Sequence, residues 1–82
     1  MKVVISMMKH YNFDAHGMSV DAIQRYLNRL LGFIPTEIQD ICVIHGYNNG
    51  TVLRDFLRSK YHHEKIVEVS DFGNGRTILR LH

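Results

Sequence analysis

Four consecutive apolar residues, Ile-Cys-Val-Ile at positions 41–44, constrain the fold more than any other stretch of the sequence. A strand with one face in water alternates apolar and polar residues, whereas a strand covered on both faces is apolar throughout, as parallel strands usually are. The segments on either side of this run have helical periodicity. Residues 41–44 are therefore predicted to form a covered, parallel strand between two helices.

The segment before this run has the pattern of an amphipathic helix that begins near Ser19. A serine hydroxyl at this position can accept a hydrogen bond from an unpaired amide of the first helical turn. Gly32 is expected to end the helix in a left-handed turn, and Pro35 prevents its continuation. The apolar residues at helical spacing, which predict the core-facing stripe, are Val20, Ile23, Leu27, Leu30 and Leu31.

A second helix is predicted over residues 51–61, and two strands follow it. Residues 65–69 and 76–81 have the composition of strands, and the glycines of the intervening Gly-Asn-Gly at 73–75 favour a hairpin turn. Residues 11–14 have the character of a further short strand. In the second helix, the apolar residues expected to face the core are Val52, Leu53, Phe56 and Leu57.

These elements predict one α/β domain, an α+β two-layer sandwich. The order is β-α-β-α-β-β, with a mixed four-stranded sheet and, because consecutive crossovers are right-handed, both helices on one face. Eighty-two residues are enough for one core only. We expect residues 10–82 to form this domain and residues 1–9 to form an N-terminal strand or arm.

The composition excludes several classes of protein. Hydrophobic residues make up 45% of the chain and charged residues 22%, which is ordinary for a globular domain, and the net charge of +2 permits a nucleic-acid partner without requiring one. The single Cys42 cannot form an internal disulfide or a cysteine zinc site, so a buried thiol and a reducing, cytoplasmic setting are expected. No stretch is long enough to cross a membrane.

Two His-Gly pairs, His16-Gly17 and His45-Gly46, each follow a predicted strand and precede a predicted helix. In a β-α-β unit the strands are parallel, so both junctions lie at the same edge of the sheet, where open α/β sheets bind ligands. The two imidazoles are expected to line one crevice. Asp14 precedes His16 by two positions and shares its face of the strand, so its carboxylate can orient or charge that imidazole.

The second junction also has the features of a phosphate site. Gly46 and Gly50 let the backbone turn sharply, and free amides at the start of the second helix would attract an anion. Arg54 lies one turn into that helix, with Arg58 and Lys60 beyond it. Each feature taken alone also has a structural interpretation: a tight connection, a hydrogen-bonded histidine, or a solvated helix face.

These residues resemble the motifs of the Smr (small MutS-related) domain family. Residues 13–17, Phe-Asp-Ala-His-Gly, are similar to the family's Leu-Asp-x-His-Gly motif, with Phe13 in place of leucine. Residues 45–50, His-Gly-Tyr-Asn-Asn-Gly, are similar to its His-Gly-x-Gly-x-Gly motif, and Arg54 follows at the family's Leu-Arg position. Asn48 replaces the middle glycine, and Tyr47 stands where a basic residue is frequent. The likeness covers residues 11–81.

The resemblance implies a fold like that of the C-terminal domain of translation initiation factor three. It implies binding of structured DNA or RNA and, as in several members, endonuclease activity that nicks the phosphodiester backbone. The catalytic candidates are Asp14, His16 and His45. The candidates for binding phosphate or nucleic acid are Gly17, Gly46, Tyr47, Asn48, Asn49, Gly50, Thr51, Arg54, Arg58 and Lys60. No protein metal site is expected.

The sequence leaves several alternatives open. Either His16 or His45 can be the general base, or Asp14 can bind a divalent cation, magnesium or manganese, that activates water. A non-catalytic RNA- or ribosome-associated binding module and a pocket for a small phosphate compound compete with the nuclease. The domain is expected to be a monomer or weak homodimer with no membrane association, and DNA is not distinguished from RNA.

Overall fold

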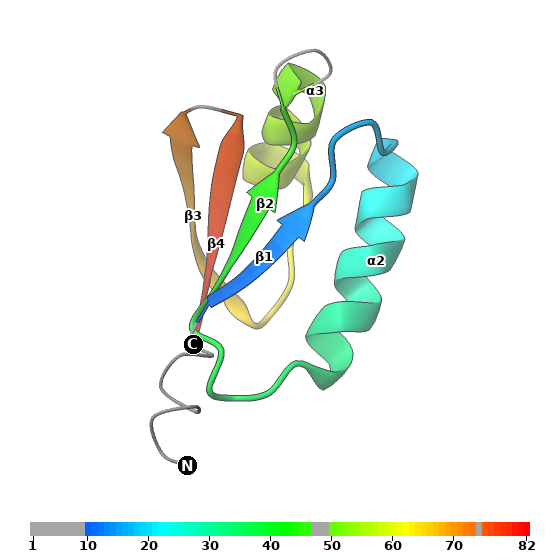
Figure 1. Ribbon diagram of the computed structural model, residues 1–82. Helices are drawn as coiled ribbons and strands as arrows, with labels where there is room; N and C mark the ends of the chain where they lie inside the picture. Colours follow the sequence, from blue (N-terminus) through cyan, green and yellow to red (C-terminus); the bar gives the residue numbers. More distant parts are fainter. Residues whose placement is uncertain (1–9, 47–49, 74) are drawn as a thin grey trace.

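The computed structural model describes residues 10–46, 50–73 and 75–82, so the expected arm at residues 1–9 lies outside the described part. The four strands are β1 (His10–Asp14), β2 (Asp40–Ile44), β3 (Ile66–Gly73) and β4 (Arg76–Leu81). They form one sheet in the order β1-β2-β4-β3, as Figure 1 shows. Strands β1 and β2 are parallel, and β4 is antiparallel to both of its neighbours. The predicted mixed sheet is confirmed.

The first helix, α2 (Val20–Phe33), starts as the sequence predicts but ends differently. The hydroxyl of Ser19 accepts a hydrogen bond from the Ala22 amide at 3.1 Å, which caps the first turn. The expectation that Gly32 ends the helix is wrong, because Gly32 lies inside it. The C-cap is Ile34, whose ψ of 137° is extended, since the following Pro35 disfavours helical geometry at the residue before it.

The second helix consists of a short α-helix, α3 (Gly50–Asp55), and a π-helical turn, η1 (Phe56–Lys60). The Tyr61 amide donates to the Phe56 carbonyl at 2.8 Å, five residues back, which defines the wider turn. Leu53, Phe56 and Leu57 are buried, as the periodicity predicts. The prediction for Val52 is wrong, because 60% of its surface is exposed.

Both helices cover the same face of the sheet, as predicted. Every second strand residue points to this face, and these residues share one core cluster with residues of α2, α3 and η1. The Tyr61 hydroxyl donates to the Asn28 side chain at 2.8 Å and so joins the end of η1 to α2. The strand residues in the core cluster are Phe13, Ile41, Val43 and Leu79.

Cys42 lies on the opposite face of the sheet and is a buried free thiol, as expected.

The β3–β4 hairpin turn packs against the end of β2 through Gly75. The Gly75 carbonyl accepts hydrogen bonds from the amides of His45 at 2.8 Å and Gly46 at 3.1 Å. Gly75 has a φ of +72°, and a Cβ built on it would meet three backbone atoms of Gly46 at 2.9 to 3.1 Å. Only glycine therefore fits at this position, for both conformational and steric reasons.

We predict that Gly75→Ala destabilises the fold far more than Gly73→Ala. Gly73 has nearly the same φ, +71°, but a Cβ there meets nothing within 4 Å, so alanine costs only the backbone strain of about 1 kcal/mol. Gly75→Ala adds a backbone clash and should cost about 3 kcal/mol or more. Urea unfolding of both variants gives the comparison, and equal losses would contradict the packing described here.

Candidate active site

The two His-Gly junctions are neighbours at one end of the sheet. The Ala15 amide donates to the Ile44 carbonyl at 2.8 Å, which continues the β1–β2 pairing one residue past the strand. A Cβ built on Gly46 would lie 3.6 Å from the Cβ of His16. Gly17, with a φ of +79°, then turns the chain toward α2.

Asp14 and His16 form a hydrogen-bonded pair at this end. Asp14 Oδ1 lies 2.8 Å from His16 Nδ1 and also accepts the backbone amide of His16 at 3.2 Å. Because an ionised carboxylate only accepts hydrogen bonds, Nδ1 carries the proton and Nε2 is left with a free lone pair. The side chains of Asp14 and His16 are 62% and 75% exposed, and Nε2 forms no hydrogen bond with a described residue.

The pair changes the acidity of both groups. The hydrogen bond that His16 donates to Asp14, together with the negative charge of that carboxylate, raises the pKa of His16 above the ordinary value of 6.5. The hydrogen bonds from the His16 side chain and backbone lower the pKa of Asp14 below 3.8. An imidazole that is fixed in one tautomer and has its pKa raised by a neighbouring carboxylate is suited to general acid–base chemistry.

His45 does not share this open environment. It is 4% exposed, its Nε2 lies 2.9 Å from the hydroxyl of Thr77, and its Nδ1 lies 3.1 Å from the Gly46 carbonyl. Since a carbonyl only accepts, Nδ1 carries the proton, and Nε2 accepts from Thr77. Both ring nitrogens are occupied, so the expectation that two imidazoles line one open crevice is wrong. Through Thr77, His45 links the end of β2 to β4 beside His16.

The free amides expected between Gly46 and Gly50 are only partly described. The Gly46 amide is paired with the Gly75 carbonyl, so it is not available to an anion. The adjoining loop candidates Tyr47, Asn48 and Asn49 lie outside the described residues, as does the side chain of Thr51. Gly50 begins α3.

Two of the predicted basic residues converge on an acidic residue that the sequence analysis missed. Nη1 of Arg54 and Nη1 of Arg58 lie 3.7 and 3.8 Å from Asp71 Oδ2. Nε of Arg54 is buried and donates no hydrogen bond to any described residue, although Asp55 Oδ1 is 3.5 Å away. These distances are long for charge-assisted hydrogen bonds, so the guanidinium groups retain donors for an anion. Lys60 is the last residue of η1 and is exposed.

A solved structure shares this fold. The Smr domain of MutS2 from Thermus thermophilus superposes with a TM-score of 0.65 at 18% sequence identity, over 88% of this chain and 98% of that domain. The chain has the Smr fold. No protein-family model matches the sequence, and no curated protein sequence matches it significantly. The comparison confirms the fold implied by the motifs at residues 13–17 and 45–50.

Two further properties bear on the expectations from the sequence. No helix in the described part of the chain is long and apolar enough to cross a membrane. Among residues 10–46, 50–73 and 75–82, no three side chains of the metal-binding types gather as a potential ligand set. A divalent ion held by Asp14 would therefore take most of its ligands from substrate and water, as magnesium commonly does.

We predict that Asp14→Asn lowers the pKa of His16 toward its ordinary value, because a neutral amide no longer stabilises the imidazolium as a carboxylate does. NMR titration of the imidazole measures this, with Asp40→Asn as a control, because Asp40 contacts His10 at the other end of β1.

The Asp14–His16 pair should also make the free energy of unfolding depend on pH. The His16 contribution is complete below pH 6.5 and is lost as pH rises through its raised pKa. The Asp14 contribution is complete above pH 3.8 and is lost as pH falls through its lowered pKa.

Proposed function

We propose that this chain is a nucleic-acid-binding domain of the Smr type that cleaves RNA at the Asp14–His16 pair. The observation that carries the proposal is the exposed imidazole of His16, whose Nδ1 is bonded to a carboxylate at the carboxyl end of a parallel strand, which leaves the lone pair on Nε2. Ligands of open α/β sheets bind at such strand ends. The likeness to Smr domains supports the fold, and the two motifs support the class of ligand.

RNA suits a site with one free imidazole because the ribose carries its own nucleophile. Nε2 of His16 takes the proton of a 2′-hydroxyl, the 2′-oxygen attacks the adjacent phosphorus, and the bond from phosphorus to the 5′-oxygen breaks. Water protonates the departing oxygen, and protonated His16 returns its proton to the resulting hydroxide. The products are a 2′,3′-cyclic phosphate and a 5′-hydroxyl end. Asp14 holds the tautomer and stabilises the imidazolium.

The arginine pair beside Asp71 supplies the phosphate contact in this proposal. Arg54 and Arg58 point to one carboxylate oxygen with donors to spare, and a phosphate can take the place of that oxygen. Asp71 competes with the ligand because it neutralises the two guanidinium groups in the free protein. It therefore lowers the affinity for nucleic acid.

We predict that Asp71→Asn binds single-stranded RNA about 3-fold more tightly at low salt, with a steeper salt dependence. Asparagine still offers the oxygen that accepts the Gly73 amide, so the local turn is retained. Glu68→Gln is the matched control: it changes the net charge equally but affects Arg80 on the uncovered face of the sheet. Equal effects of the two variants on affinity would rule out a specific role for the arginine pair.

A binding module without catalysis is the second candidate. It is favoured by one observation, the hydrogen bonding of both nitrogens of His45, which leaves the described site without a second imidazole to protonate the leaving oxygen. The same surface would then hold RNA without cutting it. A small phosphate compound as ligand would give a weak salt dependence, whereas several phosphate contacts give a steep one.

We predict that the wild-type protein cleaves a single-stranded RNA to cyclic-phosphate products and that His16→Ala lowers the rate by about 100-fold or more. His16 is exposed, so the variant should keep the fold and the affinity for RNA. The assay is run on an RNA and on its all-deoxy counterpart, each with and without a chelator. Intact RNA that is bound equally by both proteins would favour the binding module. Cleavage of the deoxy strand, abolished by chelator and restored by magnesium, would favour the metal alternative instead.

A further inference from the structure

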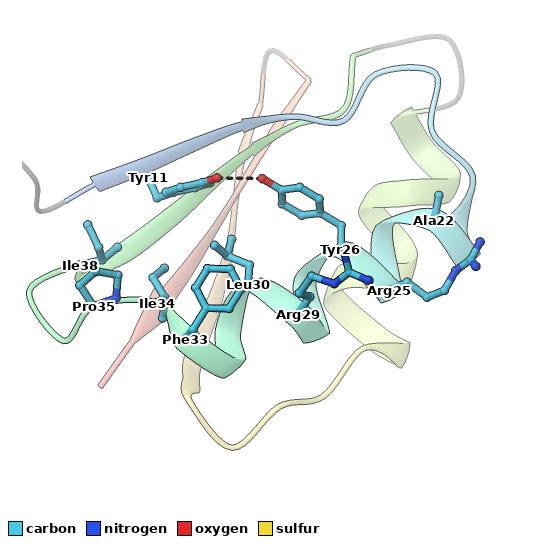
Figure 2. A pocket seen from close by; sticks show the side chains of 10 residues that line it. All are labelled: Tyr11, Ala22, Arg25, Tyr26, Arg29, Leu30, Phe33, Ile34, Pro35 and Ile38. Atoms are coloured by element: carbon cyan, nitrogen blue, oxygen red, sulfur yellow. Dashed lines mark hydrogen bonds between the residues drawn. The ribbon is translucent and has the colours of Figure 1, made fainter.

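A groove lies between β1 and α2, away from the arginine pair. Its volume is about 530 Å³, and Figure 2 shows the side chains that line it. Strand β1 is at the edge of the sheet, so none of the other described strands closes this side of the groove. The lining is mainly apolar and aromatic, and it includes Tyr11, Tyr26, Phe33, Ile34, Pro35 and Ile38.

The aromatic rings of the groove are partly fixed and partly exposed. Tyr26 stacks on Phe13 with ring centroids 4.0 Å apart and an angle of 9° between the planes. Its hydroxyl is hydrogen-bonded to that of Tyr11 at 2.8 Å, and this bond, with burial, raises the pKa of Tyr26 to about 12. Tyr26 is nevertheless 36% exposed, and Phe33 is 69% exposed. The molecule therefore presents a preorganised neutral ring beside an uncovered one.

The charged residues lining the groove are both arginines. Arg25 and Arg29 lie on successive turns of α2, and Figure 2 shows Arg25 near Ala22 at one end, with Pro35 and Ile38 at the other. Arg25 pairs with Asp21 at 2.9 Å in an exposed contact, and no acidic side chain is among the described residues that line the groove. An anionic ligand with a flat apolar part fits these surroundings better than a neutral or cationic one.

We propose that this groove binds an unstacked base of single-stranded RNA. The base extends the Phe13–Tyr26 stack or packs on Phe33, and Arg25 and Arg29 contact the flanking phosphates. The inference rests on the proposed function and deepens it, because the ring stacked on Tyr26 belongs to the residue preceding Asp14. RNA lying along the edge of β1 would reach both the groove and His16.

A peptide is the main competing ligand, because an edge strand can pair with an added strand. Such a strand would use the backbone of β1 and a pocket for one apolar side chain. A peptide strand bound in this way would not require a groove lining whose charged residues are Arg25 and Arg29. The basic rim and the exposed ring favour a base with its phosphates over a peptide.

The test measures binding of a 2′-O-methyl RNA of about 12 nucleotides, which has no free 2′-hydroxyl and is not cleaved. The intact strand is compared with strands that carry one abasic site, moved through each position. In the wild-type protein, an abasic site at one or two positions should weaken binding by about 10-fold or more. Phe33→Ala should bind the intact strand about as weakly as the wild-type protein binds those abasic strands. Its affinity should then no longer depend on whether the base at those positions is present. Val52→Ala is the matched control, since Val52 is 60% exposed and lies on α3, outside the groove.

The outcomes separate this inference from the proposed function. A wild-type protein that binds no RNA overturns both. A protein that binds RNA with equal affinity for every abasic strand, or whose Phe33→Ala and Val52→Ala variants behave alike, overturns the base site and leaves the proposed function standing. If Phe33→Ala changes only self-association in analytical ultracentrifugation, the groove is an interface between copies and the inference is also overturned.

Discussion

The Gly75 carbonyl accepts hydrogen bonds from two backbone amides, and the end of the sheet that carries the candidate site depends on this contact. It attaches the β3–β4 turn to His45 and Gly46 and seats this turn directly on the Gly46 backbone. The same contact occupies the Gly46 amide. It also adjoins the side chain of His45, which is buried. The geometry of the end of β2, beside His16, is therefore set by a residue about thirty positions further along the chain.

The fold was predictable because its main determinants are local. The apolar run at 41–44, the helical stripe before it and the glycines at 73–75 each specify an element, and right-handed crossovers then allow essentially one arrangement. The errors have local causes as well. Gly32 is tolerated inside α2 because Pro35 sets the helix end one residue beyond Phe33, at Ile34. Val52 lies on the exposed side of α3, and no periodicity indicates a π turn at η1.

The candidate site was predictable only where its contacts are short in sequence. Asp14 and His16 are two residues apart, so an extended backbone is enough to bring them together. The state of His45 depends on Thr77, 32 positions away, whose only signal was its place in an alternating strand. Asp71 likewise belongs to β3 and meets α3 and η1 only in the folded chain. Sequence patterns name the residue types at such contacts, but not which ring nitrogen or guanidinium is already occupied.

The position of β4 has a consequence for biosynthesis. Of the four strands in this sheet it is the last to be translated, yet it lies in the interior of the sheet between β2 and β3. A nascent chain can make its βαβ unit early, but β3 has no partner in the sheet until β4 leaves the ribosomal tunnel, and the Gly75 carbonyl that holds the amides of His45 and Gly46 directly precedes β4. The end of β2 beside His16 is therefore completed only when the β3–β4 hairpin docks.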